Sequence, residues 1–187
     1  KVMYGQTTAL VVPETAVNTV YPLSDLKNTA DGIEFKVENI GYKAPLYGLH
    51  NAYNLAAAIS VLREFGISKN ILPSVIAGCY NAPGRNEFIP EAEAKGFKVI
   101  VDYAFEPKAM TALHSVAALL KPARIIQVFG STGGGRDVSR RFSVGELAGK
   151  TADICIITDE DPYDDEPAII MTDVANAVRR NGKKDNE

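Results

Sequence analysis

A glycine-rich stretch is the part of this sequence best suited to hold an anion. Residues 130–137 read Gly-Ser-Thr-Gly-Gly-Gly-Arg-Asp and lie between an apolar run and a helical pattern. Glycines let backbone N–H groups approach a ligand, and the start of the following helix attracts negative charge. Arg136, Arg140 and Arg141 add positive charge to the same segment. The stretch predicts an anion site, although it lacks the G-x-G-x-x-G pattern of dinucleotide loops. The alternative is a flexible turn with solvated arginines.

Four further side chains suit the parts of a nucleotide. Asn51 and Asn54 stand three residues apart at an expected helix start, so both amides lie on one face. An amide offers a donor and an acceptor together, as the edge of adenine requires; the alternative is that Asn51 merely caps the helix. Asp102 follows an expected strand and suits a ribose hydroxyl or a magnesium-linked role, or it merely ends the strand. Arg85 follows a Pro-Gly break and suits a phosphate or a ribose, or it merely bridges two domains.

Six carboxylates follow the last expected strand. They are Asp159, Glu160, Asp161, Asp164, Asp165 and Glu166. Such a run is usually a solvated loop, but at a strand end facing a cationic loop it could hold an ammonium group.

Gly149-Lys150-Thr151 only imitates the tail of a phosphate loop. We expect it to close a helix rather than open one, and Gly145 lies one residue too near to Gly149 for that motif.

The elements that must position these side chains alternate regularly in the second half of the chain. Strands are expected over 97–103, 124–130 and 153–158, and helices over 107–120, 139–149 and 167–180. Three strand–helix repeats predict an α/β fold with a parallel sheet, in which ligands gather at the carboxyl ends of the strands. Those ends fall at Asp102, Gly130 and Thr158.

The first half is expected to be extended over residues 1–47, with an apolar stretch at 8–12 and a half-buried strand at 32–38. Helices are expected over 51–65 and 68–78. The Pro-Gly-Arg break at 83–85 is the best candidate boundary, and it predicts two domains, 1–84 and 85–187.

The composition favours a globular protein. The 187 residues are 46% hydrophobic with a net charge of −3, so a nucleic-acid partner is disfavoured, and we expect neither a membrane span nor a signal peptide. Cys79 and Cys155 are expected in the core and favour a reducing, cytoplasmic compartment. His50 and His114 are the two histidines, too few for a His-rich metal site, and His114 is expected to be structural or exposed.

Five segments, in order, resemble motifs of the Mur ligases, the ATP-dependent amino-acid-adding enzymes of peptidoglycan synthesis. They are Gly48-Leu-His-Asn-Ala-Tyr-Asn-Leu-Ala-Ala-Ala58, Pro83-Gly-Arg-Asn-Glu87, Val101-Asp-Tyr-Ala-Phe-Glu-Pro107, Val128-Phe-Gly130 with Gly134-Gly-Arg-Asp137 and Arg140-Arg141, and Thr158-Asp-Glu-Asp-Pro162. Each segment is a weak signal alone, but their joint order over residues 33–180 is a strong one. The last two point to the UDP-N-acetylmuramyl-tripeptide synthetase branch, which adds the third residue of the stem peptide.

The resemblance implies a fold and a reaction. Residues 1–84 would be the end of the central ATP-binding domain, and residues 85–187 most of a Rossmann-like C-terminal domain. In this family ATP phosphorylates the carboxylate of a UDP-N-acetylmuramyl-peptide, and the amine of a free amino acid then attacks the acyl phosphate. We expect the phosphate loop, the magnesium ligands and the modified lysine to lie upstream of Lys1, so this chain alone should be inactive.

The resemblance also implies roles for single residues. Asn51 and Asn54 would contact adenine, Asp102 would hold the ribose, and Arg85 would reach the ribose or the phosphates. The incoming amino acid would be bound by a second set of residues, which are Arg136 at its carboxylate and Glu160 and Asp161 at the border of its pocket. No catalytic residue or metal ligand is assigned within this chain.

Three departures from the family pattern affect these expectations. Phe105 replaces a histidine near the triphosphate, and the loop after Gly130 is one residue longer and lacks the Asp before Arg136. Tyr163 stands where diaminopimelate-adding members carry an arginine that grips the distal carboxylate. Among six carboxylates, this predicts a preference for a cationic side chain such as lysine over diaminopimelate.

Two other functions remain open at this point. Within the family, the alternative is an amide ligase of the folylpolyglutamate synthase kind. From another class, the alternative is a non-catalytic partner or nucleotide-binding module that keeps the fold. An upstream G-T-x-G-K-[ST] loop would favour the enzymes.

Overall fold

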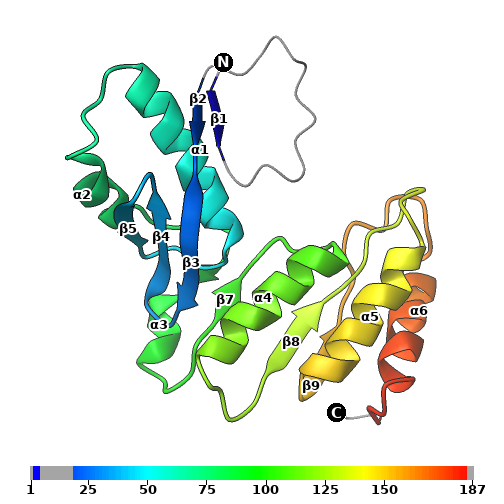
Figure 1. Cartoon of the computed structure of the whole chain (residues 1–187). Helices are drawn as coiled ribbons and strands as arrows, with labels where there is room; N and C mark the ends of the chain where they lie inside the picture. The colour runs from blue at the N-terminus through cyan, green and yellow to red at the C-terminus, as the bar shows by residue number, and fades with distance from the viewer. Residues whose placement is uncertain (1, 5–18, 185–187) are drawn as a thin grey trace. The chain divides into compact units, whose positions relative to one another are not determined.

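The structure, a computed structural model, describes residues 2–4 and 19–184 of the chain (Figure 1). The chain forms two compact units, Lys1–Asp102 and Tyr103–Glu187, and a hydrophobic core lies in each. The division after Asp102 is one of contacts within the molecule. The expected boundary after Gly84 concerns the domains of the family and stays a prediction.

The first unit is built on an antiparallel meander. β3 (Leu23–Thr29), β4 (Gly32–Val37) and β5 (Ile40–Ala44) pair in that order, while β1 (Val2–Tyr4) pairs in parallel with β2 (Thr19–Tyr21). Ile33, Phe35 and Val37 alternate into the core, which confirms the half-buried strand expected there. The apolar stretch at 8–12 lies outside the described residues.

Two helices complete the core of the first unit. α1 (His50–Glu64) buries one apolar face, and α2 (Leu72–Ala77) buries Leu72 and Ile76. α2 is shorter than the helix expected over 68–78, because Pro73 falls in its first turn and the preceding residues form turns.

A short hairpin replaces one expected parallel strand. The strand expected over 97–103 is only β7 (Ile100–Val101), and it pairs antiparallel with β6 (Glu87–Phe88). α3 (Pro90–Glu93) lies between the two strands. Phe97 and Val101 are about half exposed, so the apolar residues that predicted a buried strand do not enter a core. Asp102 therefore follows a hairpin strand of the first unit rather than a strand of the parallel sheet.

The second unit has the expected α/β order. α4 (Pro107–Leu119), β8 (Ile126–Phe129), α5 (Ser139–Thr151), β9 (Ile154–Ile157) and α6 (Pro167–Arg179) follow one another, and β8 pairs in parallel with β9 (Figure 1). The fold is α/β with a Rossmann-like parallel sheet, and its core is formed by α4, β8, α5 and α6. This geometry brings the residues after β8 and after β9 to one edge of the sheet.

Two glycines of α5 explain the false phosphate-loop motif. A Cβ on Gly145 or on Gly149 would lie 2.8 Å from the carbonyl oxygen of Val174 or of Val178, both on α6. The glycines therefore let the two helices pack closely, and Gly149-Lys150-Thr151 ends α5 as expected. Among the described residues, no helix has the length and apolarity that a membrane crossing requires.

Candidate functional site

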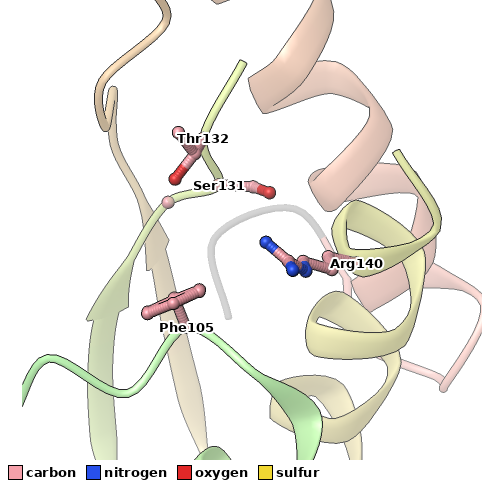
Figure 2. Close-up of a pocket in the computed structure, with 5 residues that line it drawn as sticks. Phe105, Ser131, Thr132 and Arg140 are labelled. Carbon is pink, nitrogen blue, oxygen red and sulfur yellow. The ribbon is translucent and has the colours of Figure 1, made fainter. Parts of the chain in front are cut away.

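The two loops at the carboxyl edge of the second unit lie against each other. The N–H of Thr158 donates to the carbonyl oxygen of Phe129 at 3.0 Å, and the N–H of Gly133 donates to that of Asp161 at 3.1 Å. Beside this contact is a pocket lined by Phe105, Gly130, Ser131, Thr132 and Arg140 (Figure 2). The structure thus brings the expected anion loop and the acidic run together.

The glycines of the first loop are required by this packing. A Cβ on Gly133 would lie 2.2 Å from the carbonyl oxygen of Pro162, and one on Gly134 would lie 2.7 Å from the ring of Tyr163. Real Cβ atoms do not approach so closely, so only glycine fits at either position. The glycines of the sequence predicted that another group lies close to the backbone of this loop. Within the chain, that group is the acidic loop.

Arg140 is the arginine that enters the pocket. Figure 2 shows its guanidinium pointing toward Ser131, with the ring of Phe105 on another wall. It pairs with Glu106 at 2.6 Å and lies 5.4 Å from the centre of the Phe105 ring. The pocket therefore offers one partly neutralised cation and two hydroxyls to a ligand.

A carboxylate already occupies the start of α5. Asp137 accepts the N–H of Ser139 at 2.9 Å, and hydrogen bonds from Ser139 hold the pKa of Asp137 below its usual value. Arg136, one residue earlier, is exposed. The helix start is thus less available to an anion than the sequence suggested, and Arg136 remains the exposed cation of this loop.

Arg141 does not belong to the anion loop, contrary to expectation. It is 6% exposed and pairs with Asp165 at 2.7 Å and with Asp173 at 3.2 Å. One residue along a helix rotates the side chain by about 100°, so Arg140 enters the pocket while Arg141 faces α6. Its charge ties the acidic loop to α5 and α6 instead of adding to an anion site.

Glu160 and Asp161 lie at the contact between the loops. Glu160 is half-buried and accepts the N–H of Gly130, yet burial, with the charge of Asp161, raises its pKa above the usual value. Asp161 and Tyr163 adopt φ angles of 38° and 52°, in the left-handed region that side chains rarely occupy. The acidic run is therefore a loop of defined conformation in which Glu160 and Asp165 are partly buried and the other four carboxylates are exposed.

In the first unit, Asn51 and Asn54 form the start of a hydrogen-bond network. The amide nitrogen of Asn51 donates to the carbonyl oxygen of Tyr47 at 2.8 Å, and that of Asn54 donates to Oδ1 of Asn51 at 3.2 Å. The two amides share one face of α1, as expected. Asn51 is not the N-cap, because α1 begins at His50 with Leu49 as the capping residue, so that alternative is wrong.

Asn86, which no motif of the sequence indicated, extends this network to Asp102. Its backbone N–H donates to Oδ2 of Asp102 at 2.6 Å, and its side-chain amide donates to the same Tyr47 oxygen at 3.4 Å. Arg85, its exposed neighbour, takes part in contacts of its own. Three of the expected nucleotide residues, Asn51, Asn54 and Asp102, are thus joined within one unit. The only sequence signal for Asn86 was its place beside Arg85.

His114 has a structural place, as expected. Its two ring nitrogens lie 2.8 Å from Oε1 of Gln127 and 2.6 Å from Oγ1 of Thr151, and burial lowers its pKa. Cys79 and Cys155 are both free thiols packed at the edges of the two cores. Within the described ranges, no group of three or more His, Cys, Asp and Glu side chains is arranged to hold a metal ion.

Comparison with known proteins gives a family and several relatives. The protein-family model described as "Mur ligase, glutamate ligase domain" matches residues 84–185 of this chain. The UDP-N-acetylmuramoyl-L-alanyl-D-glutamate–2,6-diaminopimelate ligase of Solibacter usitatus is 31% identical over 180 residues, which cover 96% of this chain and 35% of the relative. The chain spans about a third of the length of the curated relatives it matches.

Two solved structures share the fold. UDP-N-acetylmuramate-alanine ligase of Thermotoga maritima has a TM-score of 0.69 at 19% identity, covering 88% of this chain and 36% of that chain. Folylpolyglutamate synthase of Mycobacterium tuberculosis, complexed with ADP, has a TM-score of 0.63 at 21% identity, covering 86% and 35%. At these identities the likeness extends to the fold alone.

Proposed function

The chain belongs to the Mur ligase family, and from this premise we propose that it is part of an ATP-dependent ligase that adds an amino acid to a UDP-N-acetylmuramyl-dipeptide. The observation that carries this proposal is the network that joins Asn51, Asn54 and Asp102. The family resemblance assigns these three residues to one ligand, and they lie together within one compact unit. The name of the Solibacter relative supports the dipeptide as the acceptor.

The donor chemistry of this network fits an adenine nucleotide. The exposed amide of Asn54 retains a donor and an acceptor for a base edge. Among the described residues, one backbone donor holds the Asp102 carboxylate, which can also accept hydrogen bonds from ribose hydroxyls. Arg85 is exposed beside this network and would reach the ribose or the phosphates. The magnesium ions expected with ATP would be held by other residues of the protein.

In the proposed reaction ATP supplies the phosphoryl group that activates the carboxylate of the dipeptide. The amine of the amino acid then forms the C–N bond, and phosphate leaves as the amide is made. The residues of this chain bind and orient the reactants. Arg136 would pair with the α-carboxylate, because a guanidinium matches a carboxylate with two parallel hydrogen bonds. Glu160 and Asp161 would border the pocket of the side chain.

The loop after β9 would select the amino acid. Tyr163 is 63% exposed between Asp161 and Asp164, and no arginine lies in residues 159–166. A distal carboxylate would meet like charge there, whereas a distal ammonium group would be attracted. We therefore propose a preference for lysine, while the name of the Solibacter relative favours diaminopimelate. The two free cysteines are in keeping with a reducing, cytoplasmic location.

The proposal is tested with the longest natural protein that contains these 187 residues. It is incubated with ATP, the UDP-N-acetylmuramyl-dipeptide and lysine or diaminopimelate, and the products are identified by mass. One ADP should form for each new amide bond. A parallel reaction with a folate and glutamate tests the folylpolyglutamate synthase alternative, and product there alone would overturn the proposal. A protein that binds ADP without forming any amide would be a non-catalytic module.

A further inference from the structure

We propose that Asn86 is a positioning residue for the nucleotide site. It holds Asp102 and the segment before α1 in a fixed position relative to each other. This inference rests on the proposed function, since it concerns the same ligand. Asn86 is 4% exposed, so it would act through the residues it holds rather than by touching the nucleotide. The amide of Asn81 donates to the carbonyl oxygen of Asn86 at 2.9 Å, and the two other partners, Asp102 and Tyr47, belong to segments far apart in the sequence.

The backbone of Asn86 orients the carboxylate. Its backbone nitrogen lies 2.6 Å from Oδ2 of Asp102, and its N–H donates a short, charge-assisted hydrogen bond to that oxygen. Because one oxygen is held in this way, the direction of the other oxygen is set as well. The pairing of β6 with β7 brings the two residues together, since Asn86 precedes the first strand and Asp102 follows the second.

The side chain of Asn86 connects the same point to the asparagines of α1. Its amide nitrogen donates to the Tyr47 carbonyl oxygen at 3.4 Å, and the amide of Asn51 donates to that oxygen at 2.8 Å. A backbone carbonyl can only accept, so this contact requires the nitrogen of the Asn86 amide rather than its oxygen. Asn51 in turn accepts from Asn54, so movement of Asn86 would be felt along the network.

Asn86 is held in this place at a cost in stability. Its φ angle is 45°, in the left-handed region, and its Oδ1 atom is buried with no hydrogen-bond partner among the described residues. Both features are unfavourable, and such features are concentrated at functional sites. Asparagine tolerates this backbone conformation better than most residues, and glycine tolerates it fully.

Two substitutions separate the positioning role from a general effect on folding. Asn86→Gly keeps the backbone conformation and the N–H donor to Asp102 but removes the amide that reaches Tyr47. Asn86→Asp keeps the size of the side chain but places carboxylate oxygens near the Tyr47 carbonyl and Asp102. Asn39→Gly is the matched control, because Asn39 also has a left-handed φ, 65°, but is exposed in the turn between β4 and β5.

The readouts are the KM for ATP, kcat and the thermal midpoint, measured in the protein used to test the proposed function. We expect Asn86→Gly to raise the KM for ATP roughly threefold, the loss of one neutral hydrogen bond, and Asn86→Asp to raise it about tenfold or more. In both variants kcat should stay within about twofold of the unchanged protein. Asn39→Gly should leave the KM for ATP unchanged.

The outcomes distinguish this inference from the function on which it rests. If the unchanged protein forms the amide but both Asn86 variants keep its KM for ATP, the positioning role is overturned, whatever happens to the thermal midpoint. A fall in kcat at unchanged KM also contradicts it. If Asn86→Asp does not fold, Asn86→Gly decides alone. An unchanged protein that neither binds ADP nor forms an amide overturns the proposed function and the role of Asn86 together.

Discussion

Replacing Arg141 by methionine should destabilise the second unit far more than the same change at its neighbour Arg140. Arg141 is 6% exposed between Asp165 and Asp173, and methionine would fill the space of its apolar stem while leaving both carboxylates without their cation. Removing one partner of a buried ion pair costs about 3–5 kcal/mol. The side chains of Asp165 and Asp173 are 40% and 29% exposed, so water would reach them. We therefore expect a loss of about 2–3 kcal/mol, below the range for a fully buried pair.

The paired experiment is thermal unfolding of the 187-residue chain followed by circular dichroism. Arg141→Met should lower the midpoint by roughly 5–10 °C, given about 2–4 °C per kcal/mol for a chain of this size. Arg140→Met removes a more exposed pair with Glu106 and should lower the midpoint by less than about 4 °C. Combining Arg141→Met with Asp165→Asn and Asp173→Asn should recover much of the loss, because no buried charge then lacks a partner. Equal midpoints for Arg140→Met and Arg141→Met would refute the assignment of Arg141 to a buried ion network.

Three further predictions concern the loops and the pH dependence. Gly133→Ala should lower the free energy of urea unfolding by about 2–3 kcal/mol, because the new Cβ meets the Pro162 oxygen. At Gly135 a new Cβ has nothing within 4 Å, so Gly135→Ala should cost only about 1 kcal/mol of backbone strain. Similar losses in the two variants would contradict the contact between the loops. Burial lowers the pKa of His114 from 6.5, so the unfolded chain binds more protons just below that pH and stability should fall as the pH drops below about 6.5. His114→Gln should flatten this slope in thermal midpoints between pH 5.5 and 7.5, and an unchanged slope would assign it to other groups. When lysine and diaminopimelate compete, the unchanged protein should form mostly the lysine product. Tyr163→Arg should shift the product mixture toward diaminopimelate. A mainly diaminopimelate product from the unchanged protein would show that the charge of this loop does not select the amino acid.

Local patterns predicted much of the fold. The alternation of Ile33, Phe35 and Val37 gave a strand with one buried face, and that strand is β4. The helices of the second unit begin at the expected residues, since Pro107 and Pro167 fit a first turn and nowhere else in a helix. These signals act between near neighbours in the chain, so they can be read without knowing what packs against them.

The errors concern contacts between distant segments. The sequence 97–103 is apolar enough for a buried strand, but its partner is the two-residue β6, and this sets both its length and its antiparallel direction. Arg140 and Arg141 are adjacent arginines, and only Arg141 faces α6. That difference depends on how α5 and α6 pack, which a local pattern does not show. Asn86 reaches Asp102 across the β6–β7 hairpin, so no spacing motif revealed it.

The measurement that tests the account most directly is the KM for ATP of an Asp102→Ala variant in the longest natural protein that contains this chain. Asp102 is the end of the network that begins at Asn54, and its carboxylate is proposed to bind the ribose. Loss of charge-assisted hydrogen bonds worth about 1.5–3 kcal/mol should raise the KM for ATP at least about tenfold while the protein stays folded. A folded Asp102→Ala variant with an unchanged KM for ATP would contradict the assignment of this network to a nucleotide.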